Sequence, residues 1–224
     1  MKQFGFILFI YIFAVNIVAG ASVDIAPPIW RGGLNSTFQL WDFGANIRMP
    51  VPDLVNNCFG EPSLIVVPTK PWFSSWGGHQ GIWHLSGAIS VEIPNNSVEN
   101  LYKLIQIQFV WASEDGSSTP CFSVEANRLD GTMIPENDIV LLSQSNTLLE
   151  PTNVSEAGEY WYHTTALFKV QPNPAIETVN IGSAIMVDAL VIDTICIPEP
   201  ATMIFFTIGV FVTLKKRNIS KMMQ

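Results

Sequence analysis

Residues 83–93 decide the fold, and they read WHLSGAISVEI. Apolar residues recur on one parity of this stretch, at Trp83, Leu85, Ile89, Val91 and Ile93. Polar residues take the other parity, at His84, Ser86, Ser90 and Glu92. Because successive side chains of a strand point to opposite faces, this alternation predicts a β-strand with one buried and one solvated face.

Two other segments alternate in the same way, residues 105–111 and 160–170. Shorter candidate strands are residues 37–43, 64–67, 122–128 and 139–142. A more fully apolar run, residues 185–195, predicts a central strand that is covered on both faces.

Turn-rich segments separate these strands, including residues 114–118, Asp130-Gly131 and residues 94–96. Eight or nine strands separated by such turns predict one all-β domain over residues 22–196, a single β-sandwich or jelly roll. An outer-membrane barrel fits poorly, because few strands have the required length. No internal repeat supports a propeller or β-helix.

The N-terminal 21 residues have the pattern of a secretory signal peptide. Lys2 provides a positive start, residues 4–18 are mostly apolar, and Ala19-Gly20-Ala21 offers small residues at Ala19 and Ala21 for signal peptidase. A retained membrane helix is the alternative, but the apolar run is short for one. We therefore expect export, with cleavage after residue 21.

The C-terminal segment, residues 197–224, combines three features in order. Pro198-Glu199-Pro200 is followed by the apolar stretch 201–214 and by a basic cluster at 215–217, Lys215, Lys216 and Arg217. The stretch is shorter than the ~20 residues that span a bilayer, but the cations after it favour a transmembrane helix. The segment resembles the PEP-CTERM sorting signal of exopolysaccharide-producing Gram-negative bacteria. The resemblance implies processing by exosortase, and an inner-membrane-anchored precursor that reaches the cell surface or extracellular matrix.

The charge of the central domain excludes one class of partner. Residues 22–200 hold 6 Lys and Arg residues against 19 Asp and Glu residues, a net charge of −13, compared with −8 for the whole chain. A field of this sign repels phosphate backbones, so nucleic-acid binding is not expected. The three cysteines, Cys58, Cys121 and Cys196, permit one disulfide or none.

Residues 68–81 show no strand pattern, and we expect a long loop. Trp72, Trp76 and His79 in this segment are candidate polysaccharide-binding residues, because an exposed indole offers a flat face for a sugar ring. The alternative is that the rings fold inward and cover the open end of the core. Trp83 and Trp111 lie on the apolar parity of their strands and are expected in the core.

Trp30 and Arg31 are a second candidate binding pair. An indole beside a guanidinium would grip an acidic polysaccharide by stacking and by a planar cationic fork. The competing interpretation is a first edge strand with its turn. The arrangement is similar to segments of other β-sandwich proteins that carry this C-terminal signal, and no activity follows from that likeness.

Asp188 and Asp193 interrupt the most apolar run. They have opposite parity, which predicts that their side chains point to opposite faces of the sheet. A buried carboxylate needs a partner, so both are weak candidates for a calcium site. No other cofactor is expected.

No catalytic motif is evident, and we assign no catalytic residue and expect a protein that is not an enzyme. Glu92 and Glu125 fall on the polar parity of their strands and permit a glycosidase-like pair. His84 and His163 are expected on exposed strand faces. Scattered histidines of this kind are typical of the surface rather than of a zinc site.

These observations predict an exported protein of the cell surface or extracellular matrix that binds or organises polysaccharide without catalysis. Signal peptidase and exosortase are the expected processing partners, and exopolysaccharide is the expected ligand. Two alternatives remain, a structural matrix protein without a specific ligand and a small carbohydrate-active enzyme.

Overall fold

The computed structural model describes residues 24, 26–68, 70–96, 101–113, 117–152 and 160–198. The signal peptide with Ala19 and Ala21, and the segment from Glu199 through the basic cluster, lie outside the described residues. Of the sorting motif only Pro198 is described. Within the described residues, no helix is long and apolar enough to span a membrane.

The described chain folds into two antiparallel sheets, which confirms the all-β prediction. The main path of the eight-stranded sheet runs β2 (Leu54–Asn56), β1 (Ser36–Trp41), β12 (Ile185–Ile197), β7 (Tyr102–Ser113), β10 (Tyr160–Val170) and β9 (Ile139–Pro151). Off this path, β5 (His79–Leu85) pairs with β12, and β4 (Trp72–Trp76) pairs with β5. The four-stranded sheet runs β3 (Ser63–Val67), β6 (Ala88–Pro94), β11 (Ile176–Gly182) and β8 (Cys121–Asn127). A 3-10 turn, η1 (Glu136–Asp138), precedes β9.

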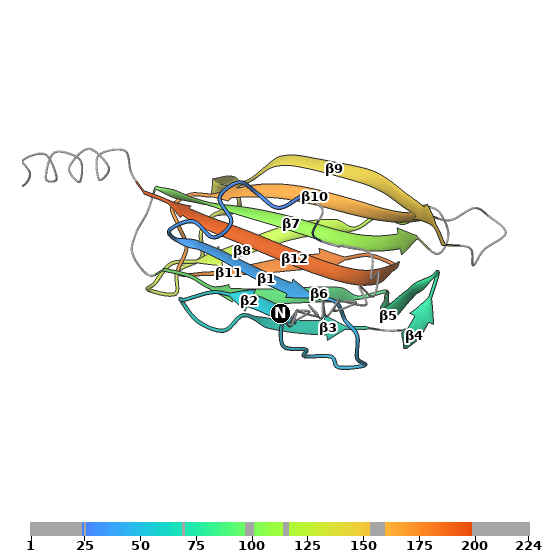
Figure 1. The fold of residues 1–224 in the computed structure, drawn as a ribbon. Helices are drawn as coiled ribbons and strands as arrows, with labels where there is room; N and C mark the ends of the chain where they lie inside the picture. The colour runs from blue at the N-terminus through green and yellow to red at the C-terminus, as the bar shows by residue number, and fades with distance from the viewer. Residues whose placement is uncertain are drawn as a thin grey trace, which may run out of the picture.

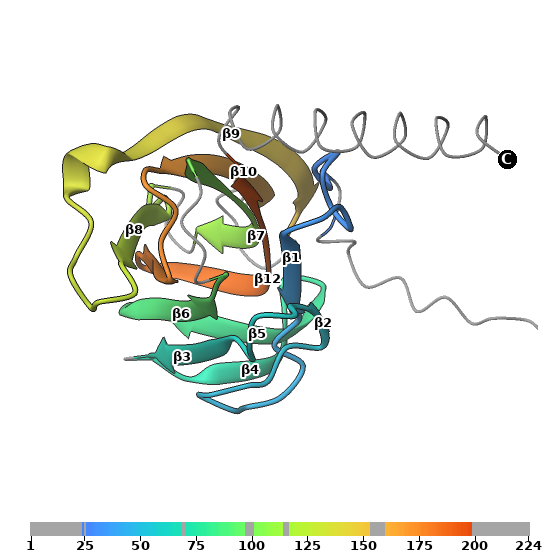
Figure 2. The same cartoon turned by 90° about the vertical axis from the view of Figure 1, so that its left-hand side faces the viewer.

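The two sheets face each other as a sandwich. In Figure 1 the strands run along the length of the molecule, and the β4–β5 hairpin lies at one end. Figure 2 shows the eight-stranded sheet curving from β9 and β10 at the top to β1 and β2, with β8, β6 and β3 on the opposite side.

The core lies between the sheets and is formed by alternate side chains of both. Trp83 and Trp111 are each 2% exposed, as predicted, and Ile89, Val91 and Phe109 are fully buried with them. Burying a side chain of this size contributes about 1.5–3 kcal/mol relative to leaving it exposed. The alternation in the sequence therefore identifies the inner face correctly.

The deciding stretch is two strands rather than one. Trp83 to Leu85 belong to β5 in one sheet, and Ala88 to Pro94 form β6 in the other, with a bend at Ser86-Gly87. A Cβ atom at Gly87 would lie 2.0 Å from the carbonyl oxygen of Val67. Only glycine allows this approach. The chain changes sheets at this bend, and its buried side chains keep the same odd-numbered parity on both sides of it.

The sequence underestimates the number of strands, because the described residues form twelve rather than eight or nine. β4 lies inside the predicted loop of residues 68–81, β2 has only three residues, and β11 has an alternation too short and too polar to stand out. The candidate strand at 139–142 extends to Pro151. The prediction for the run 185–195 is confirmed, since β12 is buried on both faces along most of its length.

One ion pair is enclosed in the core. Lys103 of β7 and Glu177 of β11 lie on the inward parity of opposite sheets, and both side chains are fully buried. Burial raises the pKa of the Glu177 carboxyl, and the charge of Lys103 opposes that rise. The pair joins the sheets, because each buried charge compensates the other in a low-dielectric setting.

Candidate functional site

The segment that contains Trp72, Trp76 and His79 is a β-hairpin, and the predicted loop is wrong. Trp76 pairs with His79 across a two-residue turn, Gly77-Gly78. Both glycines have positive φ, +61° and +88°, as the tight hairpin turn that matches strand twist requires. A Gly-Gly pair between two short runs is itself a hairpin signal, but the run WFSSW does not alternate.

The two tryptophans of the hairpin are half-buried rather than displayed on a loop. The Trp72 indole donates a hydrogen bond of 3.1 Å to the carbonyl of Phe43 and packs against the sandwich core. The Trp76 ring meets Trp161 of β10 edge-on, with ring centroids 5.6 Å apart and an interplanar angle of 79°. Both rings therefore hold the hairpin in place.

The outer face of the eight-stranded sheet carries a second, smaller apolar cluster under the hairpin tip. Its centre is Trp161, which is fully buried and donates a hydrogen bond of 2.7 Å to the carbonyl of Gly77. A Cβ atom at Gly77 would lie 3.1 Å from the Trp161 ring nitrogen. The glycine thus provides both the positive φ and the close approach that seat the tip on this ring.

His79 lies between two carboxylates beneath this tip. Its Nδ1 is 2.8 Å from Oδ2 of Asp188, and its Nε2 is 2.9 Å from Oε1 of Glu150. The imidazole stacks on Trp161, with ring centroids 4.0 Å apart and an interplanar angle of 19°. We call this arrangement the histidine clamp, since one side chain joins β5, β12, β9 and β10.

The electrostatics of the histidine clamp favour the charged ring. Burial opposes protonation of His79, but the hydrogen bonds and charges of Asp188 and Glu150 outweigh burial and raise its pKa above the usual value. Burial raises the pKa of Asp188, and His79 opposes that rise. With both ring nitrogens engaged by carboxylates, the imidazole is placed to hold the hairpin.

Arg31 is held by two carboxylates. Its guanidinium makes a two-pronged contact with Asp193, through Nε at 2.6 Å and Nη2 at 2.7 Å, and a second such contact with Asp24. It also lies 4.2 Å from the ring centroid of Phe38. Trp30 beside it is half-buried in a turn before β1. The guanidinium of Arg31 is therefore already occupied by the protein's own carboxylates.

Two glutamines of β7 also fix the N-terminal segment on the outer face of the sheet. Gln108 of β7 donates to Asp24 at 3.0 Å and accepts from the backbone of Ala26 at 2.9 Å. Gln106 donates to the carbonyl of Ala26 at 2.6 Å. The polar parity of residues 105–111 thus serves this segment rather than solvent.

Asp188 and Asp193 lie on the same face of the sheet, contrary to the prediction from parity. The register between β12 and β7 shifts between Val187 and Ala189, so Asp188 is the extra residue of a β-bulge. A bulge places two residues opposite one and reverses the parity beyond it. Both carboxylates therefore point to the outer face, where Asp188 meets His79 and Asp193 meets Arg31.

Each of these carboxylates thus has a protein cation as its partner, which meets the need that motivated the calcium hypothesis. Among the described residues, no group of three or more His, Cys, Asp or Glu side chains could hold a metal ion. The three cysteines are all described and none is bridged. Cys58 and Cys121 are exposed, whereas Cys196 is buried and burial raises the pKa of its thiol.

The remaining candidates separate into buried and exposed groups. His84 and His163 are 4% and 2% exposed, so the expectation of exposed histidines is wrong; the outer cluster covers both strands. Glu92 and Glu125 are exposed on the four-stranded sheet, where each lies opposite Thr178 of the intervening β11. Their backbones are thus two strand spacings apart, about 10 Å.

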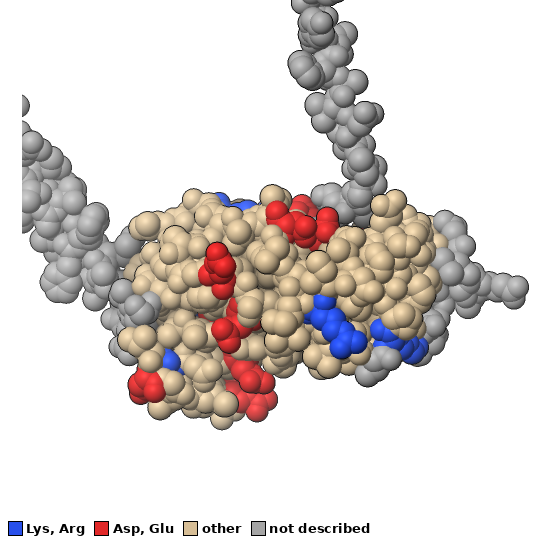
Figure 3. Space-filling model, turned by 90° about the horizontal axis from the view of Figure 1, so that it is seen from below, with Lys and Arg blue, Asp and Glu red and all other residues tan. Residues whose placement is uncertain are grey.

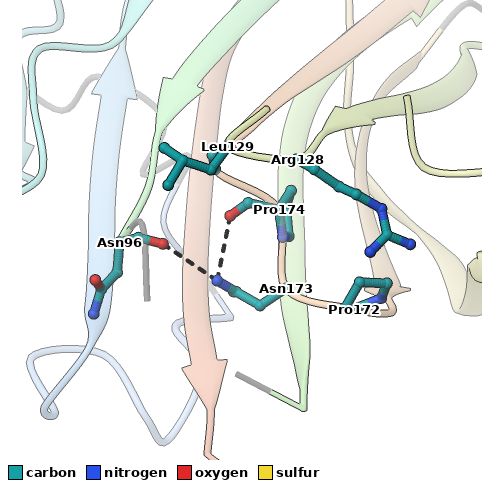
Figure 4. Close-up of a pocket in the computed structure, with 7 residues that line it drawn as sticks. Asn96, Arg128, Leu129, Pro172, Asn173 and Pro174 are labelled. Carbon is teal, nitrogen blue, oxygen red and sulfur yellow. Dashed lines mark hydrogen bonds between the residues drawn. The ribbon is translucent and has the colours of Figure 1, made fainter. Parts of the chain in front are cut away.

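A cavity of about 240 Å³ lies at the end of the sandwich far from the hairpin (Figure 4). Three loops line it, one after β6, one after β8, and one between β10 and β11. The lining residues are Asn96, Arg128, Leu129, Pro172, Asn173, Pro174 and Ala175. We call it the Arg128 pocket.

The walls of the Arg128 pocket are fixed by hydrogen bonds within the loops. Asn173 donates to the carbonyl of Asn96 at 3.4 Å and to that of Pro174 at 3.2 Å, as the dashed lines of Figure 4 show. Asn95, next to the pocket, donates to Pro174 at 2.7 Å and accepts from the thiol of Cys196. These contacts leave a preformed site.

The guanidinium of Arg128 has no hydrogen bond or ion pair within the part of the chain that the structure describes, and its charge adds only to the effect of the Thr132 hydrogen bonds in lowering the pKa of the exposed Asp130. Figure 4 shows it extended toward Pro172, away from Asn96. Sequence reasoning missed this residue, because its pocket joins segments about 30 to 75 positions apart. The only local signals are the turn at Asp130-Gly131 and the rigid Pro172-Asn173-Pro174.

Charge is unevenly distributed on the surface. In Figure 3 acidic side chains are scattered over the left and centre of the face, whereas the two largest basic areas lie toward the right. Comparison with family models, with curated proteins and with solved structures found no match.

Proposed function

We propose that the chain is an exported, non-catalytic binder of acidic polysaccharide, and that the Arg128 pocket receives a carboxylate-bearing sugar. The observation that carries the proposal is the unpaired guanidinium of Arg128 at the mouth of a preformed cavity. A guanidinium binds a carboxylate through two parallel hydrogen bonds, which select for that group more strongly than an ammonium does.

The rest of the pocket suits a sugar ring. Leu129 is 75% exposed, and with Pro172 it offers apolar surface beside polar backbone. Ligand sites combine such apolar walls with few polar groups. The volume of about 240 Å³ is below the ~300–1,000 Å³ of drug-sized ligand sites, so it fits one ring or a chain end.

Three other cations of the described domain already have partners within the protein. Arg31 is shared by Asp24 and Asp193, Lys103 is enclosed in the core, and Lys169 lies 4.8 Å from the ring centroid of Tyr102. In an acidic domain, an uncommitted arginine in a cavity is a local exception to a repulsive field. This supports the pocket over the Trp30–Arg31 and Trp72–His79 segments as the ligand site.

Export completes the proposal. The signal peptide would direct the chain out of the cytoplasm, and the sorting signal would make it a substrate of exosortase. Release from the membrane would then place the sandwich domain at the cell surface or in the extracellular matrix, where exopolysaccharide is the available acidic polymer.

Binding to polygalacturonate, a polymer of carboxylated sugars, tests the proposal. Affinity electrophoresis and calorimetry should show binding to polygalacturonate and none to neutral dextran. Arg128→Ala should weaken binding by about ten- to a hundredfold, as loss of a charge-assisted contact predicts. Arg128→Lys keeps the charge but loses the fork, and should recover only part of the affinity.

Arg48→Ala is the matched control, because Arg48 is an exposed arginine outside the pocket. It should bind as the unchanged protein does. Equal losses in the two alanine variants would mean that net charge drives binding, and unchanged binding by Arg128→Ala would remove the pocket as the site. Thermal melts of every variant verify that the fold is intact.

A structural matrix protein is the second candidate. It is favoured by the long outer strand β9, whose first 11 residues carry no charge, as is typical of a self-association edge.

A further inference from the structure

Strand β9 ends the eight-stranded sheet, and among the described residues it pairs only with β10. It is 13 residues long, whereas the other outermost strands, β2, β3, β4 and β8, have 3, 5, 5 and 7 residues. An outermost strand leaves a row of backbone donors and acceptors without strand partners. β9 therefore offers the longest such row of the described sheets, and Figure 2 shows it at the rim.

β9 lacks the features that usually block edge-to-edge pairing. The 11 residues from Ile139 to Leu149 include no charge and no proline, although the domain is strongly acidic. Lysine, inward charges and proline are the common protections of an edge. Apolar side chains are exposed along it instead, with Leu142 at 49% and Leu148 at 54%.

The chemistry of β9 reads the same in both directions about Ser145. Residues at equal distances on the two sides match in polarity: Gln144 with Asn146, Ser143 with Thr147, Leu142 with Leu148, and Leu141 with Leu149. An antiparallel pairing of two identical strands places such residues opposite each other. Pairing with an unrelated strand would not require this symmetry, so the symmetry favours a second copy of the chain as the occupant of the edge.

We propose that β9 of one chain pairs antiparallel with β9 of a second copy, about a two-fold axis at Ser145, to form one continuous sheet across a homodimer. A two-fold interface uses the same patch on both copies and closes on itself. Matched apolar pairs and matched polar pairs across strands each stabilise a sheet. The dimer leaves the Arg128 pocket on other strands, so this proposal does not depend on the proposed function.

The two neighbouring registers of the β9–β9 pairing place less compatible residues opposite each other than the symmetric register does. Shifting the centre by one residue toward the N-terminus places Asp138 opposite Glu150, so that two carboxylates oppose each other at both ends of the interface. Shifting it by one toward the C-terminus places Leu142 opposite Glu150 and Gln144 opposite Leu148. The symmetric register avoids the opposed carboxylates and places like opposite like from Leu141 to Leu149, and only at its two ends does an apolar residue, Val140, lie opposite Glu150.

The backbone of the central segment is regular. The ladder between β9 and β10 shifts register beyond Leu148 and again between Ser143 and Leu141, and is continuous from Ser143 to Leu148. The two bulges flank the proposed axis on either side. The segment that would carry the central hydrogen bonds of the dimer therefore has ordinary strand geometry.

Sedimentation of the full chain, in mild detergent, tests the proposal through a charge swap at the axis. In Ser145→Lys the two introduced charges would oppose each other, and in Ser145→Glu likewise. Each variant should raise the dimer dissociation constant by at least about fivefold, as like charges opposite each other predict. An equimolar mixture of the two variants should dimerise again, because opposite charges then meet.

Ser123→Lys in β8 is the matched control, since Ser123 is exposed on an outermost strand of the other sheet. It should leave the dimer intact. A wild-type chain that remains monomeric at 100 µM overturns the proposal, as do a dimer that resists Ser145→Lys and a mixture that stays monomeric. Ser145 is exposed, and thermal melts of each variant verify folding.

Discussion

The inner face of the eight-stranded sheet packs against four strands, whereas its outer face is covered by one hairpin and one N-terminal segment. The inner face is closed by a large apolar cluster, with the Lys103–Glu177 pair as its charged exception. The outer face has a smaller cluster around Trp161 and two charged contacts, the histidine clamp and the Arg31 pair. Where little apolar area is available, charged hydrogen bonds anchor the covering segment.

The largest expected effect comes from the inner face. Lys103→Met leaves Glu177 enclosed without a cation and should lower the free energy of unfolding by about 3–5 kcal/mol. The double variant Lys103→Met with Glu177→Leu should regain most of that loss, because it removes both desolvated charges. Urea unfolding monitored by tryptophan fluorescence measures both values.

The pH dependence sharpens this prediction. Burial raises the pKa of Glu177, so without Lys103 the folded state keeps this carboxyl protonated. The unfolded state ionises near pH 4.3, so the loss in Lys103→Met should grow as the pH rises from 5 to 8. A double variant as unstable as the single one would show that the lysine stem, rather than the charge pair, supports the core.

Loss of the Arg31 contact on the outer face should have the next largest effect on the free energy of unfolding. Arg31→Ala leaves the buried carboxylate of Asp193 without its cation, and should cost about 2–3 kcal/mol, since the partly exposed arginine is partly screened. Chemical denaturation measures the loss, and hydrogen exchange should rise at Ala26 before it rises in β12. Arg48→Ala should stay within about 0.5 kcal/mol, and a similar loss there would contradict the role of the pair.

The histidine clamp should have a smaller and pH-dependent effect. The folded pKa of His79 is raised, so its contribution is complete below the unfolded value of about 6.5 and disappears as the pH rises through the folded value. His79→Gln should therefore be about 1–2 kcal/mol less stable than the unchanged chain at pH 5.5, with the difference shrinking by pH 9. A difference independent of pH would mean that stacking on Trp161 dominates.

Cysteine reactivity gives the smallest effect. Cys58 and Cys121 are exposed and should react with a maleimide within minutes. Cys196 is buried with a raised pKa, and should react only as fast as its end of the sandwich opens. Mass spectrometry after timed labelling separates the three sites. Labelling of Cys196 at the rate of Cys58 would show that this end of the inner face is open.

Sequence reasoning predicted most of the inner face and little of the outer one. The alternation at residues 105–111 and 160–170 follows directly from burial between two sheets, so it is visible in a local window. The alternate, polar residues of the same strands are predicted to face solvent, yet Gln108 is fully buried under the N-terminal segment. A local window cannot show a segment 80 positions away.

The contacts that the candidate residues make were missed for the same reason. The Arg31–Asp193 contact joins residues 162 positions apart, and the β-bulge at Asp188 reverses a parity that the sequence shows as uninterrupted. The hairpin from Trp72 to His79 has glycines with a turn signal but no alternating flanks. The Arg128 pocket exists only after three loops meet at one end of the sandwich.

The bulge at Asp188 also divides the edge of β12 between two neighbours. Before it, Ile185 to Val187 pair with β5, and beyond it Leu190 to Ile195 pair with β1. A change in the length of the β4–β5 hairpin would therefore alter only three rungs of β12 and leave the pairing with β1 untouched. Trp83 and Leu85 would stay in the core, so only the projecting tip of the hairpin can be exchanged, at the cost of the histidine clamp, to give the same sandwich a different rim.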